Sequence, residues 1–151
     1  RKISEKRKNY NNNVTRNIVD DNYFIGIESL NVSGLMKDFK DDKTNAQNAT
    51  THKNLSDATM GEILRMLRYK SEWHDKRIVA VNRYFPSSKI CSHCGYQKSE
   101  IPVNIRIWEC PKCGSVNDRD INAAQNILKQ ALIDTYGYEL GNEYYKLGFI
   151  K

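Results

Sequence analysis

The sequence contains no long apolar segment. Its longest apolar run, Tyr23 to Ile27, has the length of a β-strand and falls far short of the roughly 20 residues that a membrane-spanning helix needs. No secretory signal peptide is recognisable. These absences exclude a membrane-spanning helix and favour a soluble, cytoplasmic protein. Cysteine is also scarce: there are four, all in two close pairs, so a metal site built from them leaves no thiol for redox or nucleophilic chemistry.

What is present is a moderate excess of positive charge. The 151 residues include 24 Lys and Arg against 18 Asp and Glu, which gives a net charge of +6 and a sequence pI near 9.1. A basic balance of this size favours a polyanionic partner such as nucleic acid. The length suits one ordinary domain with a small insert.

The cysteines are the most specific signal. Cys91 and Cys94 form one Cys-x-x-Cys pair, and Cys110 and Cys113 form a second pair fifteen residues later. Two such pairs predict a closed four-thiolate zinc site with a structural role. The alternatives are two disulfides, which would need an oxidising compartment, or four unrelated thiols.

Each Cys pair is followed by a glycine. Gly95 and Gly114 permit the positive φ angle that wraps the backbone around a metal ion. His93 lies inside the first pair, but with four thiolates available we expect it to be a bystander or a phosphate contact.

Hydrophobic patterning predicts an α/β fold in which helices cover a sheet. The polar segment 31–51 is expected to be a loop or a partly helical linker, and the tail after residue 136 to be irregular. The expected elements are a basic helix over 1–18, a buried strand over 23–28, a helix capped at residues 56–59 and ending near Asp75, a buried strand over 77–81, a ribbon strand over 103–108 and a helix over 120–136.

Both long helices have a predicted apolar face. The expected core positions are Met60, Ile63, Leu64, Leu67 and Trp73 in the first, and Ala123, Ala124, Ile127, Leu128, Ala131 and Leu132 in the second.

Carboxylates flank the cysteine segment. Glu28 ends the first apolar strand, and Asp118 and Asp120 stand directly before the last helix. An acid at the end of a buried strand can hold a divalent cation or can simply mark where the strand reaches solvent. For the two aspartates the alternative is helix capping, a role that Asp commonly fills. Asn122 and Asn126, one helical turn apart, could support a metal ligand from the second shell or could be surface residues.

Three blocks of the sequence together resemble one protein family. They are Ile27-Glu28-Ser-Leu-Asn-Val-Ser-Gly-Leu-Met36, Arg83-Tyr-Phe-Pro-Ser-Ser-Lys89 with the Cys pairs, and Asp118-Arg-Asp-Ile-Asn-Ala-Ala-Gln-Asn-Ile127. They resemble the carboxyl-terminal half of TnpB, the OrfB proteins of bacterial insertion sequences formerly called transposases, which are similar to compact type V CRISPR effectors. The match runs from about residue 1 to 135.

The resemblance implies a partial RNase H-like sheet of the RuvC type, interrupted by a four-Cys zinc ribbon. It implies RNA-guided, magnesium-dependent DNA cleavage, with DNA and a guide RNA as partners and a mobile element as the gene's context. Glu28 and Asp120 fall on catalytic, magnesium-binding positions, and Asp118 and Asn122 flank them as second-shell residues. The implied organisation is a RuvC-like region over 1–86, a zinc ribbon over 87–117, a returning RuvC-like helix over 118–136 and a tail over 137–151.

One part of the family pattern has no counterpart here. The first catalytic aspartate of the family lies on an earlier strand in a Gly-x-Asp-x-Gly-like context, and Asp20 and Asp21 are poor substitutes because they precede the glutamate strand in a turn. We therefore expect the chain to be the carboxyl-terminal part of a nuclease and to be inactive alone. The alternative is a non-catalytic zinc-ribbon fragment that binds nucleic acid. A strand-joining DDE-type transposase fits less well, because a zinc ribbon between the second and third acids does not suit it.

Overall fold

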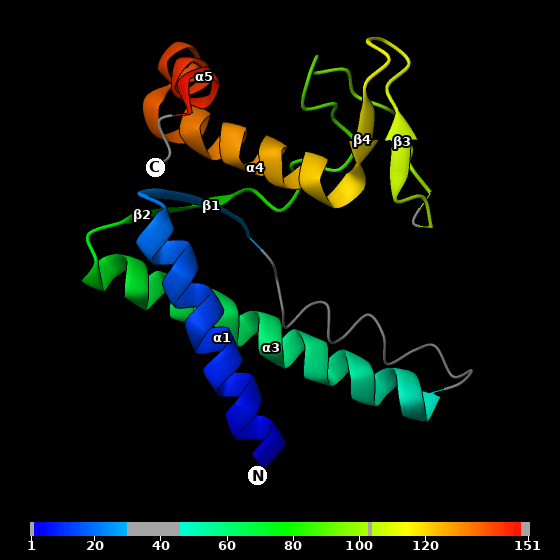
Figure 1. The fold of residues 1–151 in the computed structure, drawn as a ribbon. Coiled ribbons are helices and arrows are strands. Elements are labelled where there is room, and N and C mark those ends of the chain that lie inside the picture. Colours follow the sequence, from blue (N-terminus) through cyan, green and yellow to red (C-terminus); the bar gives the residue numbers. More distant parts are fainter. Residues whose placement is uncertain (1, 30–45, 103, 149–151) are drawn as a thin grey trace. The chain divides into compact units, whose positions relative to one another are not determined.

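The structure, a computed structural model, describes residues 2–29, 46–102 and 104–148. It confirms the mixed helix and sheet composition, with two small sheets (Figure 1). The elements in chain order are α1 (Lys2–Asp21), β1 (Phe24–Glu28), α3 (Ala46–Trp73), β2 (Arg77–Val81), β3 (Ile107–Glu109), β4 (Val116–Asp118), α4 (Arg119–Tyr136) and α5 (Tyr138–Leu147).

The chain divides into two compact units. The first contains residues 1–25 and 30–78 and therefore holds α1 and α3. The second contains residues 26–29 and 79–150, with the cysteines, the ribbon strands, α4 and α5. The division falls within β1 and β2, so each of these strands contributes residues to both units. Each unit is described by itself below.

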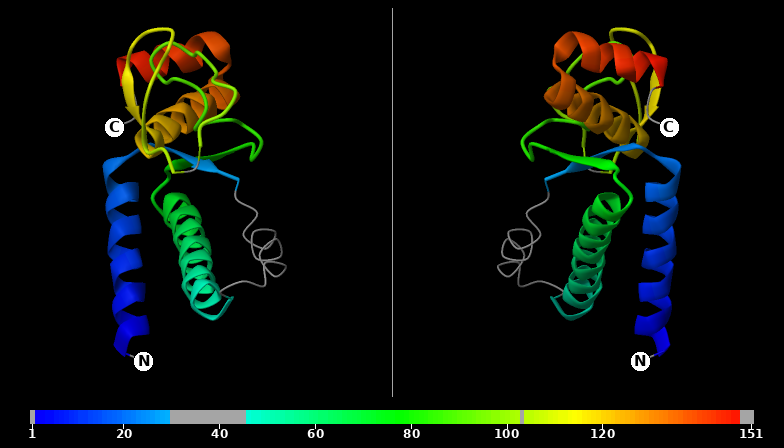
Figure 2. Two further views of the ribbon diagram at one scale, coloured as in Figure 1. Left: turned by 90° about the vertical axis from the view of Figure 1, so that its right-hand side faces the viewer. Right: turned by 90° about the vertical axis from the view of Figure 1, so that its left-hand side faces the viewer.

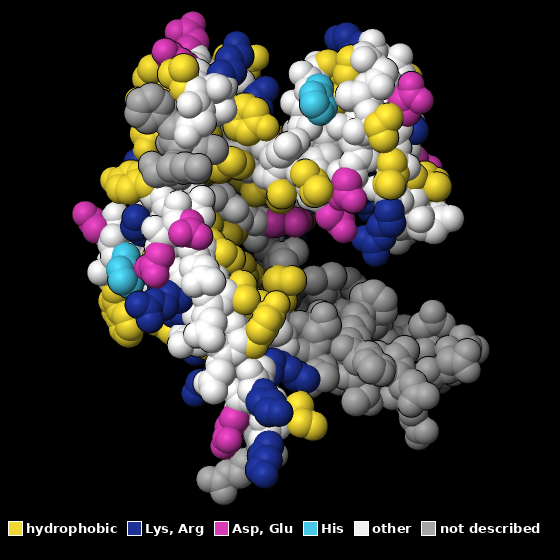
Figure 3. All heavy atoms as spheres, in the orientation of Figure 1, with side chains coloured by type: hydrophobic (Ala, Val, Ile, Leu, Met, Phe, Trp, Pro, Cys, Tyr) yellow, Lys and Arg dark blue, Asp and Glu magenta, His cyan; other side chains and the backbone are white. Residues whose placement is uncertain are grey.

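In the first unit, α1 packs along α3 (Figure 2). The buried side chains of α1 are Asn11, Thr15 and Val19, which recur every fourth residue and so form one stripe. Asn11 to Asn13 have low helix propensity, yet the helix runs through them because this stripe is buried against α3. Exposed lysines, shown in dark blue in Figure 3, gather over its amino-terminal half.

Two details of α3 differ from the expectation. The helix begins at Ala46 rather than at a cap near Ser56, and most of the predicted linker 31–51 lies outside the described residues. Met66 and Leu67 are buried, but Met60 and Trp73 are exposed. The buried stripe is completed by Lys70 and Ser71, and for Lys70 the facing side of α1 offers polar partners (Lys70 Nζ to Thr15 Oγ1, 2.9 Å).

Strands β1 and β2 form the first sheet, with the predicted bounds nearly unchanged. Their starts are joined by Arg77 N to Tyr23 O at 2.9 Å, and their ends by Ser29 N to Val81 O at 3.0 Å. Because the amino-terminal ends of β1 and β2 lie side by side, the two strands are parallel. β1 is largely buried, as predicted. The prediction was wrong for β2, in which Val81 is the one buried residue of five.

Within the second unit, β1 lies directly against α4. A Cβ added at Gly26 would stand 3.2 Å from the Ala131 Cβ and 3.2 Å from the Leu128 Cα. The glycine thus allows the strand backbone a close approach to the helix. The predicted core face of α4 is confirmed at Ala131 and Leu132, which are buried, but not at Ala124, which is exposed.

The carboxyl-terminal segment is helical rather than irregular. Helix α5 follows α4 after Gly137, whose φ of +85° turns the chain. Gly141 brings the two helices into backbone contact, since a Cβ there would lie 2.6 Å from the Cα of Ile133. The sequence pattern misses α5 because its packing depends on this glycine and not on a stripe of large apolar residues.

Strands β3 and β4 pair antiparallel, with Trp108 opposite Asn117. The predicted ribbon strand over 103–108 is therefore shorter and displaced toward Cys110, and its partner strand had no prediction. Among the helices of the described residues, none has the length and apolar character needed to cross a lipid bilayer.

Candidate metal centre and flanking carboxylates

The two cysteine pairs fold into matching turns. In the first, Gly95 N donates to Cys91 O and Cys91 N donates to Tyr96 O, both at 2.8 Å. In the second, Gly114 N donates to Cys110 O and Cys110 N donates to Ser115 O, again at 2.8 Å. The φ angles of Gly95 and Gly114 are +73° and +72°, which confirms the conformation expected of the two glycines.

These turns bring the four sulfur atoms together. Cys91 Sγ lies 3.8 Å from Cys113 Sγ, Cys94 Sγ lies 3.6 Å from Cys110 Sγ, and all four lie within 4.8 Å of one another. A tetrahedral four-thiolate zinc site with Zn–S bonds of about 2.3 Å has sulfur–sulfur distances of about 3.8 Å. All four cysteines are free thiols. The arrangement therefore fits one metal ion, and exposed His93 is not part of the group.

Hydrogen bonds around the sulfurs make the cluster ionise unevenly. Burial opposes ionisation of Cys91, but the Ser115 hydroxyl and backbone amides outweigh it and lower the pKa of this thiol to about 6. At Cys94 the Tyr96 amide favours the thiolate, yet burial and the neighbouring sulfurs raise the pKa to about 12. A cation among the sulfurs would allow all four to ionise.

Ser115 and Asn117 support the cluster from outside. The Ser115 hydroxyl oxygen lies 3.3 Å from Cys91 Sγ and 3.2 Å from Cys113 Sγ, and Asn117 Nδ2 lies 3.9 Å from Cys91 Sγ. Contacts of this kind orient thiolate ligands and tune their basicity. No role was predicted for either residue from the sequence. The one signal for such a role in the sequence is their position, two and four residues after Cys113.

A small apolar core lies beside the sulfurs. Trp108, which is 4% exposed, and Ile101 pack with Cys91, Cys94 and Cys110. Because this core has so few side chains, it gives the ribbon little apolar stabilisation.

Two asparagines of α4 hold the chain that enters the ribbon. Asn122 Nδ2 donates to Ile90 O at 2.7 Å, and its Oδ1 accepts from Ser92 N at 2.8 Å. Asn126 Nδ2 donates to the same Ile90 O at 2.6 Å and to Ser87 O at 2.8 Å. Both side chains are buried, so they are not surface residues. The structure gives Asn122 this anchoring role, and a role beside magnesium stays a prediction.

The two aspartates before α4 do different things. Asp118 is the helix N-cap, with its carboxylate accepting from Asp120 N at 2.9 Å and Ile121 N at 3.0 Å. Asp120 is 75% exposed in its side chain and pairs with Arg106 Nη1 at 3.0 Å. The Asp118 carboxylate is thus occupied by hydrogen bonds from backbone amides of α4. The Asp120 carboxylate contacts Arg106 but is otherwise accessible to solvent and to ligands. The ion pair between Arg106 and Asp120 was not predicted from the sequence.

Glu28 is half-buried at the end of β1, next to the Ser29 hydrogen bond to β2. The contact of Gly26 with α4 puts its strand beside the helix that Asp120 opens. Within the described part of the chain, the cysteines are the one group of three or more possible metal ligands. Convergence of Glu28 and Asp120 on one cation stays a prediction.

Comparison with known proteins shows which proteins are similar in sequence to the segment that carries this site. Residues 61–127 match the Cas12f1-like TNB domain. A protein of Streptomyces pristinaespiralis named as an RNA-guided DNA endonuclease is 37% identical over 87% of this chain and 30% of its own length. A TnpB-like protein of Acanthamoeba polyphaga mimivirus is 30% identical over 90% of this chain and 25% of its own length. The InsQ protein of Escherichia coli, also named as an RNA-guided DNA endonuclease, is 27% identical over 83% of this chain.

These matches confirm the resemblance to TnpB that the sequence motifs predicted. The chain spans about a quarter to a third of the length of these relatives.

Proposed function

We propose that this chain, similar over most of its length to TnpB-like proteins and RNA-guided DNA endonucleases, is the carboxyl-terminal part of such a nuclease. In this proposal the fold is part of an RNase H-like, RuvC-type domain, and the four cysteines hold a structural zinc ion. DNA is the substrate, a guide RNA is the second partner, and the reaction is magnesium-dependent cleavage of a phosphodiester bond.

The observation that supports the proposal is that the strand ending in Glu28, the segment carrying the four cysteines and the residue Asp120 are all attached to α4. Glu28 ends a strand that packs on α4, the ribbon is anchored on α4 by Asn122 and Asn126, and Asp120 lies in the first turn of α4. A ribbon fixed to this helix would hold the backbone of Asp120 in place.

Magnesium, when bound, would stabilise charge on the phosphate and activate the attacking water. Glu28 and Asp120 would hold it, since carboxylate oxygens are the ligands that Mg²⁺ prefers. Two-metal sites place their ions about 4 Å apart, so the acids must reach a small common volume. Asp118 would act indirectly, by capping the helix that presents Asp120.

One observation favours the alternative, a zinc-ribbon fragment that binds nucleic acid without cutting it. The Asp120 carboxylate already has a partner in Arg106, and among the described residues no group of three or more possible metal ligands includes Asp120. If that pair persists in the working protein, Arg106 neutralises Asp120 and the metal site is incomplete.

The test is cleavage by the gene product assembled with its guide RNA, in the presence of Mg²⁺. We expect Glu28→Ala and Asp120→Ala each to abolish cleavage while leaving DNA binding in place. The control is Asp134→Ala, which removes an exposed acid from the same helix α4. We expect residues 1–151 alone to show no detectable cleavage, because two carboxylates leave one ion weakly held. Cleavage that survives both alanine variants would overturn the assignment.

A further inference from the structure

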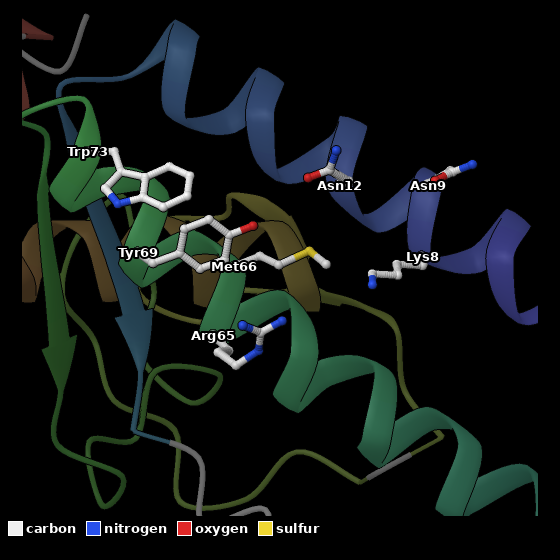
Figure 4. A pocket seen from close by; sticks show the side chains of 7 residues that line it. All are labelled: Lys8, Asn9, Asn12, Arg65, Met66, Tyr69 and Trp73. Atoms are coloured by element: carbon white, nitrogen blue, oxygen red, sulfur yellow. The ribbon is translucent and has the colours of Figure 1, made fainter.

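The pocket between α1 and α3 has no part in the metal centre. It has a volume of about 500 Å³ and lies entirely within the first unit (Figure 4). This volume is within the roughly 300–1,000 Å³ range of small-ligand sites. Its lining residues are Lys8, Asn9, Asn12, Arg65, Met66, Tyr69 and Trp73. Two of them are basic, two are aromatic and none is acidic.

The aromatic wall is open to solvent. Trp73 is 76% exposed, although the sequence pattern predicted it for the helix core. Its ring meets that of Tyr69 edge to face, with centroids 4.8 Å apart and planes at 61°. This contact joins the edge of one ring to a face of the other, and the exposure of Trp73 leaves indole surface available for stacking. An exposed tryptophan beside a tyrosine is a typical platform on which a nucleic-acid base stacks.

Each of the two helices contributes one basic side chain to the pocket. The Arg65 guanidinium lies 5.6 Å from the centre of the Tyr69 ring, and Lys8 comes from the opposite helix. Arg65 contacts Glu62 only at 3.9 Å, with a well-exposed side chain. Such a surface pair is worth little, so the guanidinium can turn to a phosphate.

Contacts between α1 and α3 hold the base of the pocket together. Met66 is buried beneath it, and its sulfur lies 3.8 Å from the Thr15 hydroxyl. The Asn12 carbonyl accepts from Lys70 Nζ at 2.5 Å, which ties the α1 wall to α3. The pocket is therefore formed by two helices that are joined beneath it.

We propose that this pocket binds one nucleotide of a single-stranded nucleic acid. The base stacks on Trp73, the phosphates contact Arg65 and Lys8, and the Asn12 amide, which lines the α1 side of the pocket, is available to the base edge. A duplex is excluded because its bases are already stacked and cannot enter. The choice of nucleic acid over other anions rests on the proposed function. The residues themselves are separate from Glu28, Asp120 and the cysteines, so either proposal can fail alone.

The test is binding of the full chain to short labelled RNA, DNA and duplex DNA, measured by fluorescence anisotropy. We expect both single strands to bind more tightly than the duplex, and the two single-strand arms show whether RNA or DNA is preferred. Trp73→Ala should weaken single-strand binding by roughly 5- to 150-fold, the range for losing one stacked base. Trp73→Phe should restore most of it.

Charge is tested separately from stacking. Arg65→Ala combined with Lys8→Ala should lower the slope of log affinity against log salt by about 1.4, at about 0.7 per phosphate contact. Arg68→Ala is the matched control, because Arg68 is exposed on the same helix and does not line the pocket. Tyr10→Ala serves the same purpose for an exposed aromatic side chain on α1.

Tryptophan emission gives a direct reading of the contact. The protein has two tryptophans, and the other one, Trp108, is buried in the ribbon. Stacking should quench the emission of Trp73, and Trp73→Phe should abolish that quenching. The proposal is overturned if Trp73→Ala binds as Arg68→Ala does, or if quenching survives Trp73→Phe. It is also overturned if a poly-glutamate peptide displaces the strand at equal concentration, which would show a basic patch only.

Discussion

Between α1 and α3 more than half of the buried side chains are polar, whereas the ribbon buries an indole, an isoleucine and the clustered cysteine sulfurs. In the helix pair, Asn11, Thr15, Lys70 and Ser71 lie inside with Val19, Met66 and Leu67. The side-chain hydrogen bonds of Thr15 and Lys70 run to groups of the same two helices, such as Thr15 Oγ1 to Asn11 O at 2.7 Å.

The two units therefore depend on different forces. The helix pair is long and shares its stabilisation among many contacts, so no single buried group should decide its folding. The ribbon is short, and its order depends on one cluster of four sulfurs. Each unit also contains one tryptophan, Trp73 or Trp108, so their stabilities can be followed separately.

The strongest test of this contrast is Cys110→Ser. Structural zinc contributes about 10–16 kcal/mol of apparent binding energy in small zinc domains, so loss of one ligand should unfold the ribbon. We expect zinc content to fall from about one equivalent per chain, measured by elemental analysis. In a Trp73→Phe background, Trp108 emission should shift to the red while helical circular dichroism remains. Lys112→Ser, an exposed change within the same turn, is the control. A metal-free wild-type protein with two disulfides would contradict the assignment.

A smaller effect is expected from Asn122→Ala, which breaks the anchoring of the ribbon on α4. Ser92 N would lose its acceptor, while Ile90 O would keep the amide of Asn126. One buried donor left unsatisfied costs about 1–3 kcal/mol. Urea unfolding of the zinc-loaded protein, followed by Trp108 emission, measures the loss.

Two further variants show whether the anchoring is specific. Asn122→Asp retains the acceptor for Ser92 N and should recover part of the stability. Gln125→Ala, at an exposed position of the same helix, should change it by less than about 0.5 kcal/mol. Equal losses for the alanine changes at 122 and 125 would show that the anchor contributes nothing.

The smallest effect is expected in the helix pair, from Lys70→Met. Burial, followed by repulsion from Arg16, lowers the pKa of Lys70 below its ordinary 10.5. The unfolded chain then binds the proton more tightly than the folded chain does, so stability should rise with pH between the lowered pKa and 10.5. Lys70→Met should remove that rise and change stability at neutral pH by about 1 kcal/mol or less. Urea unfolding at several pH values, followed by circular dichroism, measures it, and Lys6→Met on exposed α1 is the control.

Local sequence signals predicted the parts of the site that local chemistry determines. Two Cys-x-x-Cys pairs with following glycines were enough to foresee the sulfur cluster and both positive φ angles. β1 and α4 were also foreseen, because a short apolar run and a 3.6-residue period are strong patterns.

Contacts between distant segments could not be predicted from the same patterns. The sequence predicts a metal-supporting or a surface role for Asn122, since nothing local shows that Ile90 and Ser92 will reach it. The pattern predicts Trp73 in a core, because approximate helical spacing does not show which face of α3 the partner helix covers. The start of α3 was misplaced because the capping signal at residues 56–59 is also compatible with a helix interior.

Gly141 limits how this protein can vary. Its Cα faces the Ile133 backbone so closely that any other amino acid would place a Cβ 2.6 Å from main-chain atoms that cannot rotate away. Neighbouring exposed positions such as Glu139 and Leu140 carry no such limit. Under random mutagenesis with selection for folding, the last helix should therefore accept many replacements around one position that accepts none. Among the sequences of functional variants, an invariant glycine at position 141 would therefore mark the place where α5 packs on α4.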